Sequence, residues 1–399
     1  MAAGTDKWIA AVLFVFLGHA LSADTFQHKS SDQVFHGFVI QTDENGLTSI
    51  QTTESGIQKV NLSEYQVQSN SIGRNQTVPI LSINDEISYE IETAAFEQAL
   101  LKESQKGPLF ILIEIDTPGG RVDLTQRLCA AISQLQFCPT VAFIKGEKNL
   151  GAYSAGSAVA LACGKIYMAP NTAMGAATAI VNIDGTLKTD KDVFGEAIGE
   201  KFASAWRNYL AALAEKNNRP GILAKAMENK EIEVLEIQRD GKTCFIDARD
   251  KRFSDRVISV FCKQGELLTL TPERAVHCGM AEGIADTRIG LLEMLKADQA
   301  EIQVNQDLPK ARQELEQVIK RFNKLMEMLD LNFKKLEAKD QQQSLRRPDA
   351  MKSLQEILKQ ADYLIRLKQK YPDVPVDEER LVEFRNSVRA EYESIRAIR

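Results

Sequence analysis

The chain has 399 residues, of which 44% are hydrophobic, and a formal net charge of −6. This length supports more than one domain. The mild acidity, without a basic aromatic face, argues against nucleic acid as the main partner. The six cysteines and four histidines form no Cys-x-x-Cys pair and no histidine-rich cluster, so the sequence predicts no metal site and no cofactor.

Residues 1–23 have the composition of a secretory signal peptide. Lys7 precedes an apolar run over residues 8–17, and small residues follow as far as Ala23. We therefore expect an exported protein, periplasmic or secreted, and the alternative that the signal stays uncleaved as a membrane anchor remains open. No later run reaches the ~18 consecutive apolar residues of a spanning helix.

Export permits disulfides, although the pairing of the six cysteines is not readable from the sequence. Cys129 and Cys163 fall on apolar or small-residue helical stretches, which favours buried thiols. Cys244 and Cys262 flank a polar turn in a two-strand pattern and are candidates for a disulfide across it.

Beyond the signal, the pattern of the chain changes twice. Residues 24–77 alternate between apolar and polar side chains and are broken by Asn-Gly and Ser-Gly pairs, which predicts a small β-rich region. Residues 78–298 carry longer apolar runs between helical patterns, which predicts an α/β core. Residues 299–399 are charged and helical in pattern, which predicts a helical tail.

Two glycine-rich turns in the core are the main indication of function. An apolar run over residues 109–115 ends at an Asp-Thr-Pro-Gly-Gly turn, where backbone N–H groups are free to point at a ligand. A second run, residues 140–144, precedes Gly-Ala-Tyr-Ser-Ala-Gly at 151–156, which opens a helix with Ser154 at its positive end. Either turn alone is equally consistent with an ordinary turn or helix cap. Together they suit an acyl-transfer site.

With the Ala-Pro-Asn-Thr-Ala-Met-Gly-Ala-Ala stretch at 169–177, these turns closely resemble the NfeD-type periplasmic serine proteases. Those proteases belong to the Clp protease and crotonase superfamily, in which signal peptide peptidase A is a cousin. The resemblance covers about residues 78–298 and implies a Clp/crotonase-like α/β core that performs acyl transfer.

The resemblance also assigns roles within the turns. Ser154 would be the nucleophile, and Gly119 would supply one oxyanion-hole N–H. Ala155 follows the nucleophile directly, so its N–H is expected to be the second donor. Gly120, Gly175 and Ala176 are assigned to substrate binding, whereas Asp116 is expected to shape its turn through its side chain.

The general base is a separate question. None of the four histidines, which are His19, His28, His36 and His277, lies between Ser154 and the closing segment of the core, so a Ser-His-Asp triad is disfavoured. The alternative is a lysine kept neutral by desolvation, which requires lowering its pKa by roughly 3 units, or about 4 kcal/mol.

Lys201 is the favoured base. It lies near the start of a predicted amphipathic helix over residues 196–216. In NfeD-type proteases the catalytic lysine opens such a helix, which closes on an Ala-Glu pair before a basic, asparagine-containing turn, and residues 214–219 match that pattern. Lys165, Lys188 and Lys191 remain as alternatives.

The tail has a seven-residue apolar repeat, which favours a coiled-coil-like seam. Its members are Leu315, Phe322, Leu329 and Leu336. Two more amphipathic helices are predicted at residues 351–371 and 377–398. Packing of these helices on each other within the chain is favoured over pairing with a second chain.

The sequence thus predicts an exported serine endopeptidase with a Ser-Lys dyad. By resemblance, its substrate would be a hydrophobic stretch of a membrane protein or peptide, and the chain would form a homo-oligomer. Three alternatives remain: a crotonase-type acyl-CoA enzyme, disfavoured because export separates it from cytoplasmic CoA; a catalytically silent scaffold acting through the helical tail; and a docking or sensor protein that partners membrane proteases.

Overall fold

The computed structural model describes residues 24–43, 45–52, 56–68, 76–135, 138–183, 186–341 and 346–397. The predicted signal at residues 1–23 lies outside this set. The chain divides into two compact units, one comprising Met1–Ser88 with Phe96–Asn305 and the other Tyr89–Ala95 with Gln306–Arg399.

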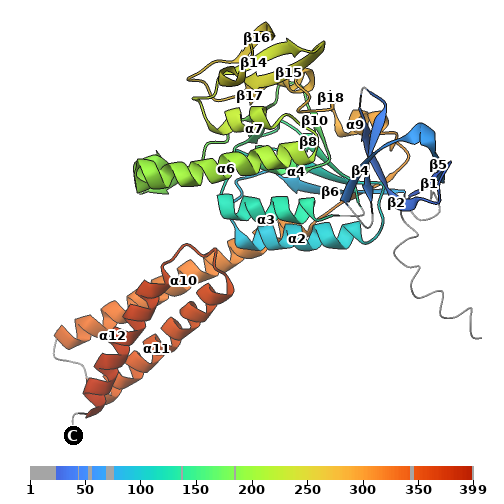
Figure 1. Cartoon of the computed structure of the whole chain (residues 1–399). Helices are drawn as coiled ribbons and strands as arrows, with labels where there is room; N and C mark the ends of the chain where they lie inside the picture. The colour runs from blue at the N-terminus through green and yellow to red at the C-terminus, as the bar shows by residue number, and fades with distance from the viewer. Residues whose placement is uncertain are drawn as a thin grey trace, which may run out of the picture. The chain divides into compact units, whose positions relative to one another are not determined.

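The first unit begins with a five-stranded antiparallel sheet (Figure 1). Its strands, in the order β4-β3-β2-β1-β5, are β1 (Asp24–His28), β2 (Val34–Thr42), β3 (Leu47–Thr52), β4 (Gly56–Asn61) and β5 (Tyr65–Gln68). The inward side chains, which are Phe26, Phe35, Ile50, Val60 and Tyr65, form a small apolar core of their own. Within the predicted β-rich region, the alternating residues 35–40 fall in β2, and the alternating residues 58–61 fall in β4.

A six-stranded parallel sheet forms the centre of the first unit. In the order β18-β10-β8-β7-β6-β19, its strands are β18 (Gly283–Ile284), β10 (Lys165–Met168), β8 (Thr140–Ile144), β7 (Ile111–Ile115), β6 (Thr77–Ile83) and β19 (Glu301–Val304). Every residue of β7 and β8 is buried, which explains their continuous runs of apolar residues. The predicted α/β class with a helical C-terminal region is confirmed.

Helices cover this sheet (Figure 1). They are α2 (Glu90–Ser104), α3 (Val122–Ser133), α4 (Ala155–Ala162), α6 (Glu196–Lys216), α7 (Gly221–Glu228), α8 (Pro272–His277) and α9 (Arg288–Met294). Leu291 and Leu292 of α9 pack on Leu112 and Phe143 at one face of the sheet. The bounds of α6 are those predicted from its helical periodicity.

Shorter strands extend the core beyond the carboxyl ends of the sheet. β9 (Gly151–Tyr153) pairs in parallel with β11 (Ala173–Gly175), which in turn pairs with β17 (Thr269–Leu270). A hairpin of β12 (Ile180–Ile183) and β13 (Thr186–Thr189) leads into α5 (Asp190–Phe194) and then α6.

The predicted Cys244–Cys262 disulfide is wrong. A three-stranded sheet places β14 (Val234–Arg239) between β15 (Lys242–Asp247) and β16 (Arg256–Cys262), and the two cysteines lie on the outer strands. Two strand spacings, about 9.6 Å, exceed the Cα separation that a disulfide bridges. All six cysteines are free thiols. Cys129 and Cys163 are buried as predicted, and burial raises the pKa of the Cys163 thiol to about 12.

The predicted tail does not begin as a helix. β19 pairs in parallel with β6 as the edge strand of the central sheet, so residues 301–304 belong to the core. The alternation of Ile302 and Val304 with polar residues is the strand signal at this position.

The second unit contains three long helices, α10 (Asp307–Gln341), α11 (Arg347–Lys370) and α12 (Glu378–Ala397). The four seam residues of α10 are each at most 5% exposed, and Phe322, Leu329 and Leu336 pack against apolar side chains of α11 and α12. Packing within the chain is therefore confirmed. No helix in the described part of the chain is both long and apolar enough to span a membrane.

The second unit also includes the start of α2, which other residues of this unit bind. Both carboxylate oxygens of Asp373, between α11 and α12, accept backbone N–H groups at the α2 N-terminus, from Glu90 at 2.8 Å and Ile91 at 2.9 Å. Arg312 of α10 forms an ion pair with Glu92. A distant carboxylate thus replaces the local N-cap that α2 lacks.

Candidate active site

The turn after β7 is organised by the Asp116 carboxylate. It accepts the N–H groups of Lys148 at 2.6 Å, Asn149 at 3.0 Å and Gly151 at 3.3 Å. These bonds join the end of β7 to the loop that enters β9. The prediction that Asp116 shapes its turn through its side chain is confirmed.

Ser154 occupies a strained turn between β9 and α4. Its backbone has φ 50° and ψ −116°, which is unfavourable for a residue with a side chain. The turn is held because Ser154 N–H donates to the Gly175 carbonyl at 3.0 Å. Ser157 Oγ reinforces it by accepting the Gly175 N–H at 2.8 Å and donating to Ala152 O. A strained strand-to-helix turn of this kind presents a hydroxyl outward, as in nucleophile elbows.

Gly119 lies directly against Ser154. A Cβ added at Gly119 would stand 2.7 Å from Ser154 Cβ, 3.1 Å from Ser154 Oγ and 3.3 Å from Ala155 N. With φ +119°, this position also favours glycine for its backbone conformation. The structure therefore brings Gly119, Ser154 and Ala155 together.

Two backbone N–H groups at this junction are open. Gly119 N–H donates to Thr117 Oγ1 at 3.1 Å, so it already has an acceptor. Within the described ranges, neither the Gly120 N–H nor the Ala155 N–H has an acceptor. Ser154 Oγ is likewise without a hydrogen bond to any described residue.

Gly175 and Ala176 support the serine turn through their backbone groups. Gly175 uses its N–H for Ser157 Oγ and its carbonyl for Ser154 N–H, so both backbone groups support the serine turn. A Cβ there would approach Leu268 O to 2.3 Å. Ala176 N–H donates to the same Leu268 carbonyl. These two residues hold the turn in place.

Lys201 lies on the exposed side of the first turns of α6. Its ammonium has no acceptor among the described residues, Ser154 Oγ included. The same helix is anchored further along, where Trp206 Nε1 donates to the Ala177 carbonyl at 2.8 Å. Lys201 is five residues earlier, about 7.5 Å along the helix axis.

The alternative lysines differ sharply in their surroundings. Lys191 forms ion pairs with Glu196 and Glu200, both at 2.9 Å, and hydrogen bonds to these carboxylates raise its pKa. It is thereby held charged and is a poor base. Lys188 is exposed on β13. Lys165 begins β10 at the amino end of the sheet, away from Ser154, although burial lowers its pKa.

An exposed apolar surface lies on the same segment as Lys201. We call Ile180, Phe194, Ile198 and Phe202 the α6 apolar face. These side chains are 48–54% exposed, and the rings of Phe194 and Phe202 contact each other at 5.5 Å between centroids. Phe202 lies outside the buried stripe of α6, whose large members are Trp206, Leu210 and Leu213.

Sequence reasoning missed the role of the turn after α6. Arg219 is 3% exposed, and its guanidinium donates to the carbonyls of Met280 and Cys163. Asn217 Nδ2 donates to Leu161 O. The basic, asparagine-containing turn thus fastens α6 to the end of α4. The only signal in the sequence is a basic residue that follows the helix. That signal does not distinguish a buried structural arginine from an arginine in solvent.

Comparisons with known proteins find similar sequences for this part of the chain. Residues 77–259 match the family of NfeD1b N-terminal domains. The chain is 28% identical over 237 residues to the membrane protein NfeD1b of Bacillus subtilis (strain 168), covering 59% of this chain and 45% of that protein. It is 27% identical over 139 residues to the membrane-bound protease PH1510 of Pyrococcus horikoshii, covering 34% of this chain and 29% of that protein.

The chain spans less than half the length of these two curated relatives. Among solved structures, a serine-to-alanine mutant of the 1510-N membrane-bound stomatin-specific protease is 22% identical, with a TM-score of 0.42, covering 58% of this chain and 98% of that one. A lysine-to-alanine mutant of that protease, in complex with a substrate peptide, is 20% identical with a TM-score of 0.41 over 58% of this chain and 91% of that one. Residues 77–259 are thus similar to NfeD1b N-terminal domains, and part of the chain is similar in sequence to a named protease.

Proposed function

We propose that this chain is a serine endopeptidase in which Ser154 is the nucleophile and Lys201 the general base. The observation that carries the proposal is the strained turn at Ser154. Its hydroxyl is free of hydrogen bonds to described residues, and the open Ala155 N–H and the Gly119 backbone lie beside it. A strained backbone that holds a serine hydroxyl beside open N–H groups is suited to nucleophilic attack on a carbonyl, because the N–H groups can then bind the oxyanion that forms.

The reaction would proceed by acyl transfer. Neutral Lys201 takes the proton of Ser154 Oγ, which attacks the peptide carbonyl, and the developing oxyanion accepts hydrogen bonds from Ala155 N–H and from the Gly119-Gly120 turn. Each such donor is often worth roughly 3 kcal/mol. Gly120 N–H is open, whereas Gly119 N–H must leave Thr117 Oγ1 or share its proton. The protonated lysine then protonates the leaving amine, and water, activated by the same lysine, releases the acid product.

A covering partner is part of this proposal. A general base must be shielded from water, and Lys201 is exposed in this structure, so the proposal requires a second chain or a bound substrate to cover it. The adjoining α6 apolar face supplies surface for that contact. We therefore propose a homo-oligomer in which the cover over Lys201 completes the site.

The substrate would be a hydrophobic segment of a membrane protein or a peptide, cut by a protein exported to the periplasm or beyond and acting near the membrane. The relatives support this proposal in general terms, because one is named a membrane protein and the other a membrane-bound protease. A membrane protease as partner is a further part of the proposal.

A catalytically silent scaffold is the second candidate. The observation that favours it is the exposure of Lys201, which makes no hydrogen bond to Ser154 in the described structure. Such a protein would act by docking through the three-helix second unit.

Covalent labelling separates the two candidates. We expect a serine-reactive fluorophosphonate to label the full-length protein and not the Ser154→Ala variant, and the same variant to lose peptide cleavage. Because Ser154 Oγ makes no bond to a described residue, folding of the variant should be unchanged by circular dichroism. Equal labelling of both proteins, or no labelling of the wild type at any concentration, would favour the scaffold.

A further inference from the structure

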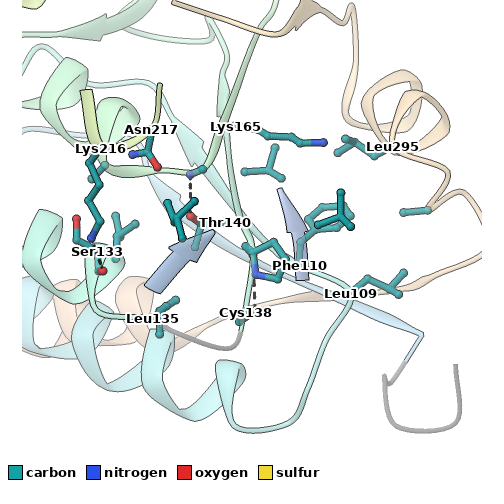
Figure 2. Close-up of a pocket in the computed structure, with 18 of the residues that line it drawn as sticks. Leu109, Phe110, Ser133, Leu135, Cys138, Thr140, Lys165, Lys216, Asn217 and Leu295 are labelled. Carbon is teal, nitrogen blue, oxygen red and sulfur yellow. Dashed lines mark hydrogen bonds between the residues drawn. The ribbon is translucent and has the colours of Figure 1, made fainter. Parts of the chain in front are cut away.

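A hollow lies at the amino ends of the parallel strands, away from Ser154 (Figure 2). Its volume is about 230 Å³. The walls come from the starts of β7, β8 and β10, from the ends of α3, α6 and α9, and from β2 and β4 of the first sheet. None of its lining residues has a role in the proposed protease reaction.

Most of the wall is apolar. Phe110, Ile132, Val141, Ala162 and Ala297 are buried around the hollow. Leu109, Leu135 and Leu295 complete the lining as partly buried residues. At roughly 30 Å³ for a group the size of a water molecule, the hollow takes about seven or eight such groups, the size of a medium-length hydrocarbon chain.

Three lysines border this apolar wall. Lys216, Lys165 and Lys296 line the hollow, and none is ion-paired with a carboxylate among the described residues. Burial lowers the pKa of both Lys165 and Lys216. The charge of Glu282 raises the pKa of Lys165, against the effect of burial. The Glu282 carboxylate, however, already forms an ion pair with Arg219 and accepts the Ile166 N–H. The hollow therefore has an excess of positive charge.

The Lys216 side of the hollow carries an unused polar group. Ser133, the last residue of α3, has its Oγ buried without a hydrogen-bond partner, and no other described side chain has a buried polar atom in that state. Lys216 Nζ donates to the Ser133 carbonyl at 2.7 Å, which leaves two of its three N–H bonds available. Figure 2 shows Lys216 and Ser133 together on one side of the hollow, with Lys165 and Leu295 on the other.

We propose that this hollow binds a medium-chain monocarboxylate, with its hydrocarbon chain along the apolar wall and its carboxylate on Lys216 Nζ and Ser133 Oγ. The hydrocarbon chain of the ligand would contact Phe110, Val141 and Ala162 and exclude water from them. The carboxylate would accept one bond from an ammonium that lacks an anion and another from a hydroxyl that lacks a partner. An uncharged ligand of the same length would make the apolar contacts with the wall but would leave the Lys216 ammonium without a counter-ion.

Isothermal titration calorimetry with octanoate on the full chain tests this proposal. We expect octanoate to bind, 1-octanol to bind at least tenfold more weakly because it lacks the charge, and acetate not to bind because it lacks the chain. A charge-assisted hydrogen bond of roughly 1.5 kcal/mol corresponds to that tenfold loss. Octanol binding as tightly as octanoate, or no binding of octanoate, would overturn the proposal.

Variants locate the carboxylate. Lys216→Gln should weaken octanoate binding about tenfold, whereas Lys242→Gln, a change at an exposed lysine of β15 outside the hollow, should not alter it. Ser133→Ala should weaken binding while raising the melting temperature of the unliganded protein, because it removes a buried hydroxyl without a partner. Full affinity in Lys216→Gln, or loss of affinity in Lys165→Gln alone, would exclude the assigned carboxylate position.

Discussion

The two regions that the proposed dyad joins are constructed differently. The surroundings of Ser154 consist of buried backbone, fixed by Asp116 on one side and by Gly175 on the other. The first half of α6, which carries Lys201, is exposed and has four bare apolar side chains in or beside it. One region has its geometry determined within the chain, whereas the other offers surface that this chain does not cover.

The difference follows from the physical origin of each property. A strained turn needs only hydrogen bonds and close packing, which local sequence and the central sheet provide. A neutral lysine needs water to be excluded from it, and that depends on whatever lies on top of the helix. The comparison therefore predicts that changes near Ser154 act on geometry, and that changes near Lys201 act on protonation and assembly.

The largest expected effect is at the proposed base. Lys201→Arg should lower kcat/KM for peptide cleavage roughly 10²- to 10⁴-fold, because a guanidinium stays charged and cannot accept the serine proton. Lys191→Arg is the matched control in the same segment, since arginine keeps the ion pairs with Glu196 and Glu200 and activity should persist. A fully active Lys201→Arg enzyme would remove Lys201 from the dyad.

The next effect concerns the geometry around Ser154. Gly119→Ala should lower kcat/KM about 100-fold, because its Cβ would stand 2.7 Å from Ser154 Cβ and must displace the serine. Gly241→Ala is the control, since it shares a positive φ in a hairpin turn but has no atom within 4 Å of the added Cβ. Gly241→Ala should lose about 1 kcal/mol of stability because of its positive φ, and Gly119→Ala should lose more because its Cβ also meets Ser154, but only Gly119→Ala should lose activity. Equal activities would show that Gly119 does not position the nucleophile.

Sequence reasoning succeeded where the signal is local. The bounds of β8 and α6 follow from one continuous apolar run and one helical repeat, and the Ser154 turn follows from glycines at a strand end. It failed for β19, whose four residues are mostly exposed and give little apolar signal. It also failed for Cys244 and Cys262, because strand order in a sheet depends on pairing between distant residues.

The contacts within the candidate site have the same limit. Two turns that each follow a parallel strand are expected to meet at one edge of the sheet, so the meeting of Gly119 with Ser154 was predictable in outline. The capture of Gly119 N–H by Thr117, and the support of Ser154 by Gly175, require coordinates. The hollow at the opposite end of the parallel sheet is lined by residues from many separate segments, so no sequence motif predicts it.

An intermediate effect is expected at the α6 apolar face. Phe202→Asp should shift the protein toward monomer in sedimentation velocity and lower kcat/KM about tenfold, since a charge on this surface opposes the contact that shields Lys201. Phe253→Asp is the control, because Phe253 is an exposed phenylalanine outside the α6 apolar face. A Phe202→Asp enzyme that stays active and keeps its association state would contradict a covering partner.

The smallest expected effect lies at α2, the helix that both units share. Asp373→Ala removes the two acceptors at the N-terminus of α2, and the loss of a helix cap costs about 1 kcal/mol. Hydrogen exchange at Glu90 and Ile91 should therefore quicken roughly fivefold. Asp330→Ala, at an exposed carboxylate paired only with Lys334 on α10, should leave this exchange unchanged.

Activity adds a second readout to the same variant, because Ile87, three residues before Glu90, donates its N–H to the Gly119 carbonyl at 2.8 Å. A loosened α2 start therefore acts on the oxyanion turn through this single hydrogen bond, and kcat should fall by no more than about threefold while KM stays constant. A much larger loss of kcat would mean that the second unit controls the nucleophile region, and that the geometry around Ser154 is not determined by the protease core alone. Unchanged exchange at Glu90 and Ile91 would instead show that Asp373 does not cap α2 in solution.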